Sequence, residues 1–157
     1  MNKIKFNIMY FAAVVVANIG FTYLPMISLP GGQSLAPMSF LIGFVFVLRD
    51  YAQRELGHKV LGVMAAGVAV SYLLADPFVA LASAVAFAIS ELTDWLVYTY
   101  TKKSMRQRVL ISSAISTPVD SSVFMLMLGF FSLPGLLIMT ASKMVGALAV
   151  WYWAGRK

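Results

Sequence analysis

The sequence predicts an all-α integral membrane protein, a compact bundle of six transmembrane helices with both termini in the cytoplasm. Of its 157 residues, 61% are hydrophobic and 11% are charged, and the mean hydropathy is +0.84, whereas soluble domains are roughly 45–50% apolar and about 25% charged. The apolar residues form six runs, and the basic residues fall between alternate runs. Spans of about 20 residues leave room for one transmembrane domain, residues 1–157, and no separate soluble domain.

The six apolar runs define the expected helices. They cover residues 6–24, 36–48, 60–75, 77–100, 109–131 and 134–154. The second and third runs are short for a hydrocarbon core about 30 Å thick. We therefore expect the second helix to continue into the charged segment that follows it, and the third to pack among its neighbours.

The first run follows Lys3 and Lys5, a pattern that a secretory signal peptide also shows. A retained membrane helix is favoured, because the run is long and leads into bulky residues, F-T-Y-L-P, where a signal peptide has a cleavage site of small residues.

The basic residues predict the orientation. Eleven of the twelve lie at the two ends of the chain and in two of the five loops, with Arg49, Arg54 and Lys59 between the second and third runs, and the other three loops contain none. Cytoplasmic loops are enriched in Lys and Arg, which predicts a multi-pass membrane protein with both termini in the cytoplasm. Three residues are expected near the outer surface and Ser104 near the cytoplasm; the outer three are Gln33, Asp76 and Pro134. The formal charge of +6 is then explained by basic residues on the cytoplasmic side of the membrane, and no nucleic-acid partner is expected.

Several chemistries are excluded by what the sequence lacks. It has no cysteine and one histidine, His58, so thiolate sites and histidine clusters are excluded. It has no phosphate-cradling G-x-x-x-x-G-K-[ST], no H-E-x-x-H and no G-x-S-x-G motif. We expect no enzyme activity, no cofactor and no bound metal.

Four ionisable residues fall inside the predicted helices. Counted from Pro77 at ~1.5 Å per residue, Glu91 lies roughly 21 Å deep, and Asp94 shares its helix face at i+3. Asp120 and Lys143 fall near the middle of the fifth and sixth helices. A charge at this depth costs at least ~2.5–3.5 kcal/mol on insertion scales. All four are therefore expected to face the bundle interior.

Two interpretations of these groups stay open. In the first, Lys143 forms a structural salt bridge with one carboxylate. In the second, three carboxylates against one lysine leave a surplus that marks a binding site. Pro118, close to Asp120, frees a backbone carbonyl in mid-helix, which fits either a cavity or a kink that only shapes packing.

Two further patterns carry expectations. Four glycines are expected to allow close helix contact; they are Gly62, Gly67, Gly129 and Gly146. Asp50 and Arg54 are spaced for i,i+4 pairing, either in a solvated segment that sets orientation or in gating and coupling.

Four ordered segments resemble the queuosine-precursor transporter family, also called the VUT family. They are L-R-D-Y-A-Q-R-E-L-G (48–57), A-D-P-F-V-A-L-A-S-A-V-A-F (75–87), S-E-L-T-D-W-L-V-Y (90–98) and S-T-P-V-D-S-S-V-F (116–124). Members resemble the six-helix substrate-binding subunits of energy-coupling-factor vitamin transporters. The resemblance implies import of a 7-deazaguanine across the inner membrane. It places the family's functional positions on Asp50, Arg54, Glu91, Asp94 and Asp120.

The chemistry of a deazaguanine suits these residues. Its ring N–H and exocyclic amine lie side by side, two donors that match the two oxygens of a carboxylate. Lys143, Ser116 or the neighbouring Thr117 could serve the carbonyl and the remaining polar groups, and Trp95 or Tyr98 could stack on the flat ring. Another vitamin- or purine-like substrate and a non-transporting assembly or regulatory subunit are the alternatives. A homodimer and separate energising subunits are both compatible with the sequence.

Overall fold

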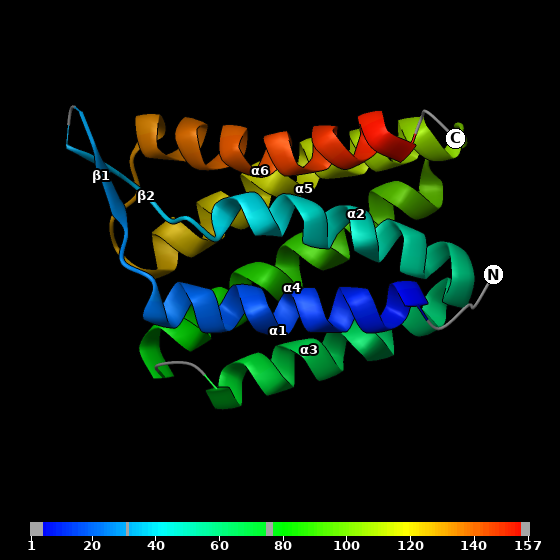
Figure 1. Cartoon of the computed structure of the whole chain (residues 1–157), viewed down its shortest axis with the longest axis horizontal. Coiled ribbons are helices and arrows are strands. Elements are labelled where there is room, and N and C mark those ends of the chain that lie inside the picture. The colour runs from blue at the N-terminus through cyan, green and yellow to red at the C-terminus, as the bar shows by residue number, and fades with distance from the viewer. Residues whose placement is uncertain (1–4, 31, 75–76, 155–157) are drawn as a thin grey trace.

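The computed structural model describes residues 5–30, 32–74 and 77–154 (Figure 1). Their elements, in chain order, are α1 (Lys5–Tyr23), β1 (Ile27–Leu29), β2 (Gln33–Leu35), α2 (Ser39–Leu56), the 3-10 turn η1 (Gly57–Lys59), α3 (Val60–Leu74), α4 (Pro77–Tyr100), α5 (Met105–Met127) and α6 (Leu133–Ala154). The helices lie along one long axis, and the start of α1 and the end of α6 are at the same end of the bundle. Asp76 lies outside the described residues.

The helices have the length and composition of membrane spans. Within the described part of the chain, four helical stretches qualify, and Leu133–Ala149 is a shorter apolar helix; the four are Lys5–Tyr23, Ser39–Leu74, Leu81–Tyr100 and Met105–Met127. The stretch Ser39–Leu74 contains both α2 and α3, which run in opposite directions (Figure 1). The predicted class, an α-helical membrane protein, is confirmed. Six crossings and cytoplasmic termini stay predictions.

The distribution of side chains also suits a lipid environment. Large apolar residues cover the outside, among them Leu73 at 80% exposure, while charged residues such as Arg49 and Lys143 are about 1% exposed inside the bundle. Because lipid solvates apolar groups and not charges, this inverted arrangement is stable in a bilayer.

The second helix continues into the charged segment, as predicted. Helix α2 runs on to Leu56 and ends at Gly57, whose φ of 60° favours glycine. Helix α3 packs against α1 and α4. It lies at the edge of the bundle, and its Tyr72 and Leu73 are exposed.

The segment between α1 and α2 forms an antiparallel hairpin that the sequence analysis did not anticipate. Ile27 pairs with Leu35, and Leu29 with Gln33. Gly32, with φ of 76°, lies in the turn. The hairpin covers the end of the bundle opposite the start of α1 (Figure 1), and the Ser132 hydroxyl donates to Gln33 Oε1 at 3.1 Å.

Two of the four glycines have the predicted role. A Cβ at Gly146 would meet the Phe40 carbonyl oxygen at 2.5 Å, and one at Gly67 would meet Val14 Cγ1 at 3.0 Å. The prediction is wrong for Gly62, which has open space around the Cβ position, and for Gly129, which follows the end of α5 with φ of 75°.

A close helix approach also occurs at Gly43, which was not among the glycines expected from the sequence. A Cβ there would overlap the carbonyl oxygen of Lys143 and lie 2.9 Å from its carbonyl carbon. Gly43 and Gly146 together let α2 and α6 touch backbone to backbone, which sets the place of Lys143 in the bundle.

Candidate functional site

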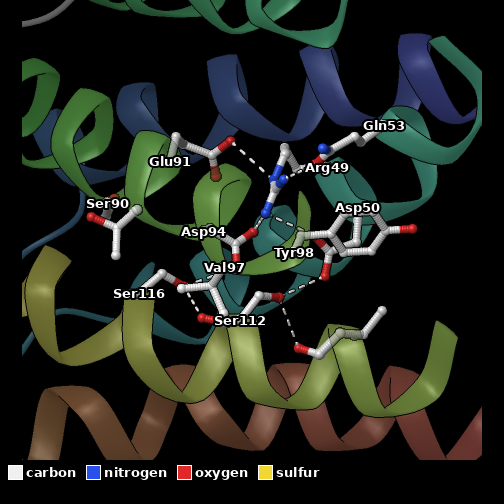
Figure 2. Close-up of polar contacts among 12 residues, drawn as sticks. Arg49, Asp50, Gln53, Ser90, Glu91, Asp94, Val97, Tyr98, Ser112 and Ser116 are labelled. Atoms are coloured by element: carbon white, nitrogen blue, oxygen red, sulfur yellow. Dashed lines mark hydrogen bonds and ion pairs between the residues drawn. The ribbon is translucent and has the colours of Figure 1, made fainter. Parts of the chain in front are cut away.

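The polar interior of the bundle has two centres, and the first is built around Arg49 of α2 (Figure 2). Arg49 Nη2 lies 2.7 Å from Asp50 Oδ1 and also forms an ion pair with Asp94 Oδ2. Arg49 Nε lies 3.8 Å from Glu91 Oε2. One guanidinium therefore faces three carboxylates, one on its own helix and two on α4.

Neutral side chains complete this first centre. The Tyr10 hydroxyl of α1 donates to Glu91 Oε2 at 2.5 Å. From α5, the Ser112 hydroxyl donates to Asp50 Oδ2 at 2.9 Å, and the Ser116 hydroxyl lies 3.3 Å from Asp94 Oδ1. Arg49 Nη1 donates to Gln53 Oε1. Because three other helices supply groups to it, the first centre joins α1, α2, α4 and α5.

The second centre is built around Lys143 of α6. Its Nζ lies 2.5 Å from Asp120 Oδ2 and donates to Ser121 Oγ at 2.8 Å. The Ser90 hydroxyl of α4 donates to Asp120 Oδ1 at 2.9 Å. Ser90 precedes Glu91, so the two centres adjoin along α4.

Helical spacing explains why these side chains meet. Ser112, Ser116 and Asp120 recur every four residues on α5 and so share one face. On α4, Glu91 and Asp94 are three residues apart and share the face toward α2 and α5. Both helices are otherwise apolar enough to span a membrane, so their polar faces turn inward.

The charges in the two centres do not balance. Four carboxylates are buried against two cations among the described residues: Asp50, Glu91, Asp94 and Asp120 against Arg49 and Lys143. The predicted pairing of Lys143 with one carboxylate is present, and its partner is Asp120. The predicted surplus of carboxylates is also present, although its members differ, because Arg49 and Asp50 enter the count.

The predicted pairing of Asp50 with Arg54 and the solvated location of Arg49 and Asp50 are wrong. Arg49 and Asp50 are both buried in the bundle, and Asp50 pairs with Arg49 in place of Arg54. The physical reason is that α2 continues through this segment and turns residues 49, 50 and 53 inward, whereas Arg54 is exposed. A role of Asp50 and Arg54 in gating or coupling stays a prediction.

The two predicted stacking residues lie in different surroundings. Tyr98 is buried, with the Arg49 guanidinium 5.7 Å from its ring centroid and that of Arg108 at 5.5 Å. Trp95 is half-buried, and its ring meets His58 edge-on at 5.5 Å. Tyr98 is therefore the aromatic ring that adjoins the first centre.

Sequence reasoning missed Arg49 and Tyr10 as interior residues. A signal for Arg49 was available, because ten residues at ~1.5 Å each place it about 15 Å along a helix that begins at Ser39. Tyr10 gave no such signal, because an aromatic residue in an apolar run is usually packing.

Among the described residues, three buried polar atoms of the predicted site have neither a hydrogen-bond partner nor an ion-pair partner: Glu91 Oε1, Thr117 Oγ1 and Trp95 Nε1. Buried polar groups in folded proteins are nearly always paired. These atoms can therefore bind a ligand or water. Within the same residues, no group of three or more His, Cys, Asp or Glu is placed to hold a metal ion.

A series of cavities leads from the hairpin to the second centre. The largest of them, about 410 Å³, is lined by Met26, Gln33, Met125 and Ser132 among others. The next, about 80 Å³, shares Met26 with it and is also lined by Phe21 and Phe124. Those two rings, 5.5 Å apart, also line a space of about 10 Å³ beside Asp120 and Lys143. That space has room for one water at most.

Comparison with known proteins identifies the family. Residues 6–154 match the family model Vut_1, described as "Putative vitamin uptake transporter". The chain belongs to this family. No curated protein and no solved structure gave a match.

Membership of the vitamin uptake transporter family accounts for the general character of the chain. The family description is that of an uptake transporter, which agrees with helices long and apolar enough to cross a membrane. The family suggests transport of a small molecule within a lipid bilayer and gives no support to an enzyme.

Proposed function

We propose that this protein imports queuosine precursors across the inner membrane. The substrates are 7-cyano-7-deazaguanine, 7-aminomethyl-7-deazaguanine or queuine, and the site is the carboxylate-lined interior of the bundle. Two observations support the proposal: the membership in a vitamin uptake family and the resemblance of four ordered sequence segments to queuosine-precursor transporters.

The observation that carries the proposal is the surplus of buried carboxylates. Each ionised group at membrane depth costs ~2.5–3.5 kcal/mol or more unless it is paired, and two of the four exceed the available cations. A base that offers two adjacent N–H donors would satisfy one carboxylate fully. Asp94 and Asp120 are the proposed acceptors, with the free Glu91 Oε1 as a third.

The remaining side chains suit the rest of a deazaguanine. Lys143, Ser116 and Thr117 offer donors for the carbonyl oxygen of the base. Tyr98 offers a ring on which a flat base can stack, and it already lies beside Arg49. Trp95 is the second candidate for stacking.

The cavities suggest the route. The hairpin end of the bundle is free of basic residues in the sequence, so the positive-inside rule places it outside, with both termini in the cytoplasm. A base would enter at the large cavity beside Gln33 and Ser132. Phe21 and Phe124 would have to move apart to let it reach Lys143, because the space there holds one water at most.

The family description favours one alternative, uptake of a different vitamin- or purine-like molecule. Separate energising subunits would then resemble those of energy-coupling-factor transporters. The same carboxylates would bind a substrate with a comparable pair of donors.

Queuosine in tRNA tests the proposal. In a bacterial host that cannot make the precursor and lacks its own importer, this gene should restore queuosine when one of the three bases is supplied at low concentration. An empty vector is the control. Unchanged queuosine with every base, although the protein accumulates in the membrane, would reject the proposal and leave the alternative substrate class.

A further inference from the structure

Arg49 occupies the part of the interior where the proposed substrate would bind. Its guanidinium forms an ion pair with Asp94 and lies 5.7 Å from the centroid of the Tyr98 ring (Figure 2). A carboxylate on one edge and an aromatic ring on one side are the two contacts expected for a deazaguanine. A second carboxylate also faces the guanidinium, because Glu91 Oε2 lies 3.8 Å from Arg49 Nε.

The guanidinium of Arg49 and the donor edge of a deazaguanine are chemically alike. A guanidinium is planar, presents adjacent N–H donors that match a carboxylate, and stacks on aromatic rings. In a deazaguanine the ring N–H, the carbon beside it and the exocyclic amine make up the same N–C–N unit. Arg49 and the donor edge of the base would therefore compete for the same acceptors.

Arg49 also has partners that do not depend on α4. Asp50 Oδ1 lies 2.7 Å from its Nη2, and Gln53 accepts from its Nη1. Both residues belong to α2, like Arg49 itself. The guanidinium can thus leave Asp94 and Glu91 and still be paired, which avoids an isolated charge in the membrane.

We propose that Arg49 is a built-in substitute for the substrate: it fills the Asp94 and Tyr98 position in the empty protein and withdraws to Asp50 and Gln53 when the base binds. This inference rests on the proposed function. It makes Arg49 a positioning residue that lowers affinity, because a site that is free for only a fraction of the time binds with its intrinsic dissociation constant divided by that fraction.

Two substitutions should tighten binding. Arg49→Lys keeps the positive charge but has one ammonium group in place of the separate guanidinium nitrogens that face Asp94 and Glu91, so its hold on α4 is weaker. Gln53→Glu adds a carboxylate on α2 and draws the guanidinium away from Asp94. If the free fraction in the wild type is about a tenth, each variant should bind the base up to about tenfold more tightly. A purely structural arginine would give equal or weaker binding in both.

Arg108→Lys is the matched control. Arg108 lies against the same Tyr98 ring at 5.5 Å, and its Nε donates to the Lys103 carbonyl at 3.0 Å. It forms no ion pair with Asp94 among the described contacts, so its substitution should leave the affinity for the base unchanged.

The experiment is equilibrium binding of 7-cyano-7-deazaguanine, 7-aminomethyl-7-deazaguanine and queuine to the purified full-length protein in nanodiscs, with thermal unfolding as the check on folding. Tighter binding by both variants and not by Arg108→Lys supports the inference. Unchanged or weaker binding by either folded variant overturns it and leaves the proposed function intact. If Arg49→Lys does not fold, Gln53→Glu decides alone. Absence of binding to the wild type and to every variant overturns the proposed function and, with it, this inference.

Discussion

Lys143 and Asp120 form a buried ion pair, with Nζ and Oδ2 2.5 Å apart. Removal of one partner of such a pair leaves an uncompensated charge and typically costs ~3–5 kcal/mol. Lys143→Met should therefore lower the thermal stability of the purified protein and its abundance in the membrane. Adding Asp120→Asn should restore both. Lys103→Met, at an exposed lysine, is the control; a stable Lys143→Met protein would contradict the structural importance of the pair.

Asp94 and Glu91 should differ in their tolerance of an amide. Asp94→Asn replaces one acceptor by a donor that faces the N–H groups of the base, and an unsatisfied buried group costs ~1–3 kcal/mol, about 5- to 150-fold in affinity. Glu91→Gln still offers an acceptor to the Tyr10 hydroxyl and should lose less. Binding of the three bases to each purified variant measures the difference. Equal losses, or a greater loss with Glu91→Gln, would contradict this order.

For the helices, the sequence predicted which residues lie inside the bundle better than it predicted which side chains contact one another. Apolar runs indicated the helices, and the shortness of the second run indicated that α2 continues through the charged segment. The interior location of Glu91, Asp94, Asp120 and Lys143 followed from their depth, and the structure has them buried. Arg49 was taken for a cytoplasmic charge, because charge counting along a sequence does not tell which face of a continuing helix turns inward.

Partners between helices could not be predicted because they depend on helix rotation and packing. The pairing of Arg49 with Asp94 joins α2 to α4, and the Tyr10 contact with Glu91 spans 81 residues of sequence. The hairpin was missed for a related reason: three-residue strands give too short an alternation to separate them from a loop.

The contact of α2 with α6 depends on Gly43. A Cβ at this position would overlap the Lys143 carbonyl oxygen, a backbone atom that cannot rotate away. Gly43→Ala should force the two helices apart and lower stability by about 1–3 kcal/mol, as overpacking does.

Gly62→Ala is the matched control, because its Cβ position has nothing within 4 Å and alanine is the better helix former. Abundance in the membrane and thermal unfolding measure both variants. Equal behaviour of the two would mean that α2 and α6 are not in close backbone contact.

For the whole molecule, the orientation in the membrane can be tested independently of the substrate. The chain has no cysteine, so single substitutions give a clean labelling experiment. Ser34 in the hairpin and Ser104 before α5 are both exposed serines at opposite ends of the bundle. In intact cells, an impermeant thiol reagent should label Ser34→Cys, and should label Ser104→Cys only after the cells are opened. The reverse pattern would contradict the predicted topology.

The central claim is that buried carboxylates of the bundle recognise the transported base. The most direct measurement is queuosine in tRNA of a precursor-deficient host that expresses the Asp94→Asn, Asp120→Asn double variant, with membrane abundance measured in the same cells. Arg49 keeps Asp50 and Glu91 in this variant. Lys143 loses the charge of Asp120 and keeps the Ser121 hydroxyl, so the membrane abundance should fall, and the comparison is with wild-type protein expressed at the same lowered abundance. The account predicts protein in the membrane and queuosine reduced to the level of the empty vector. Queuosine at the wild-type level in cells with the double variant would contradict it.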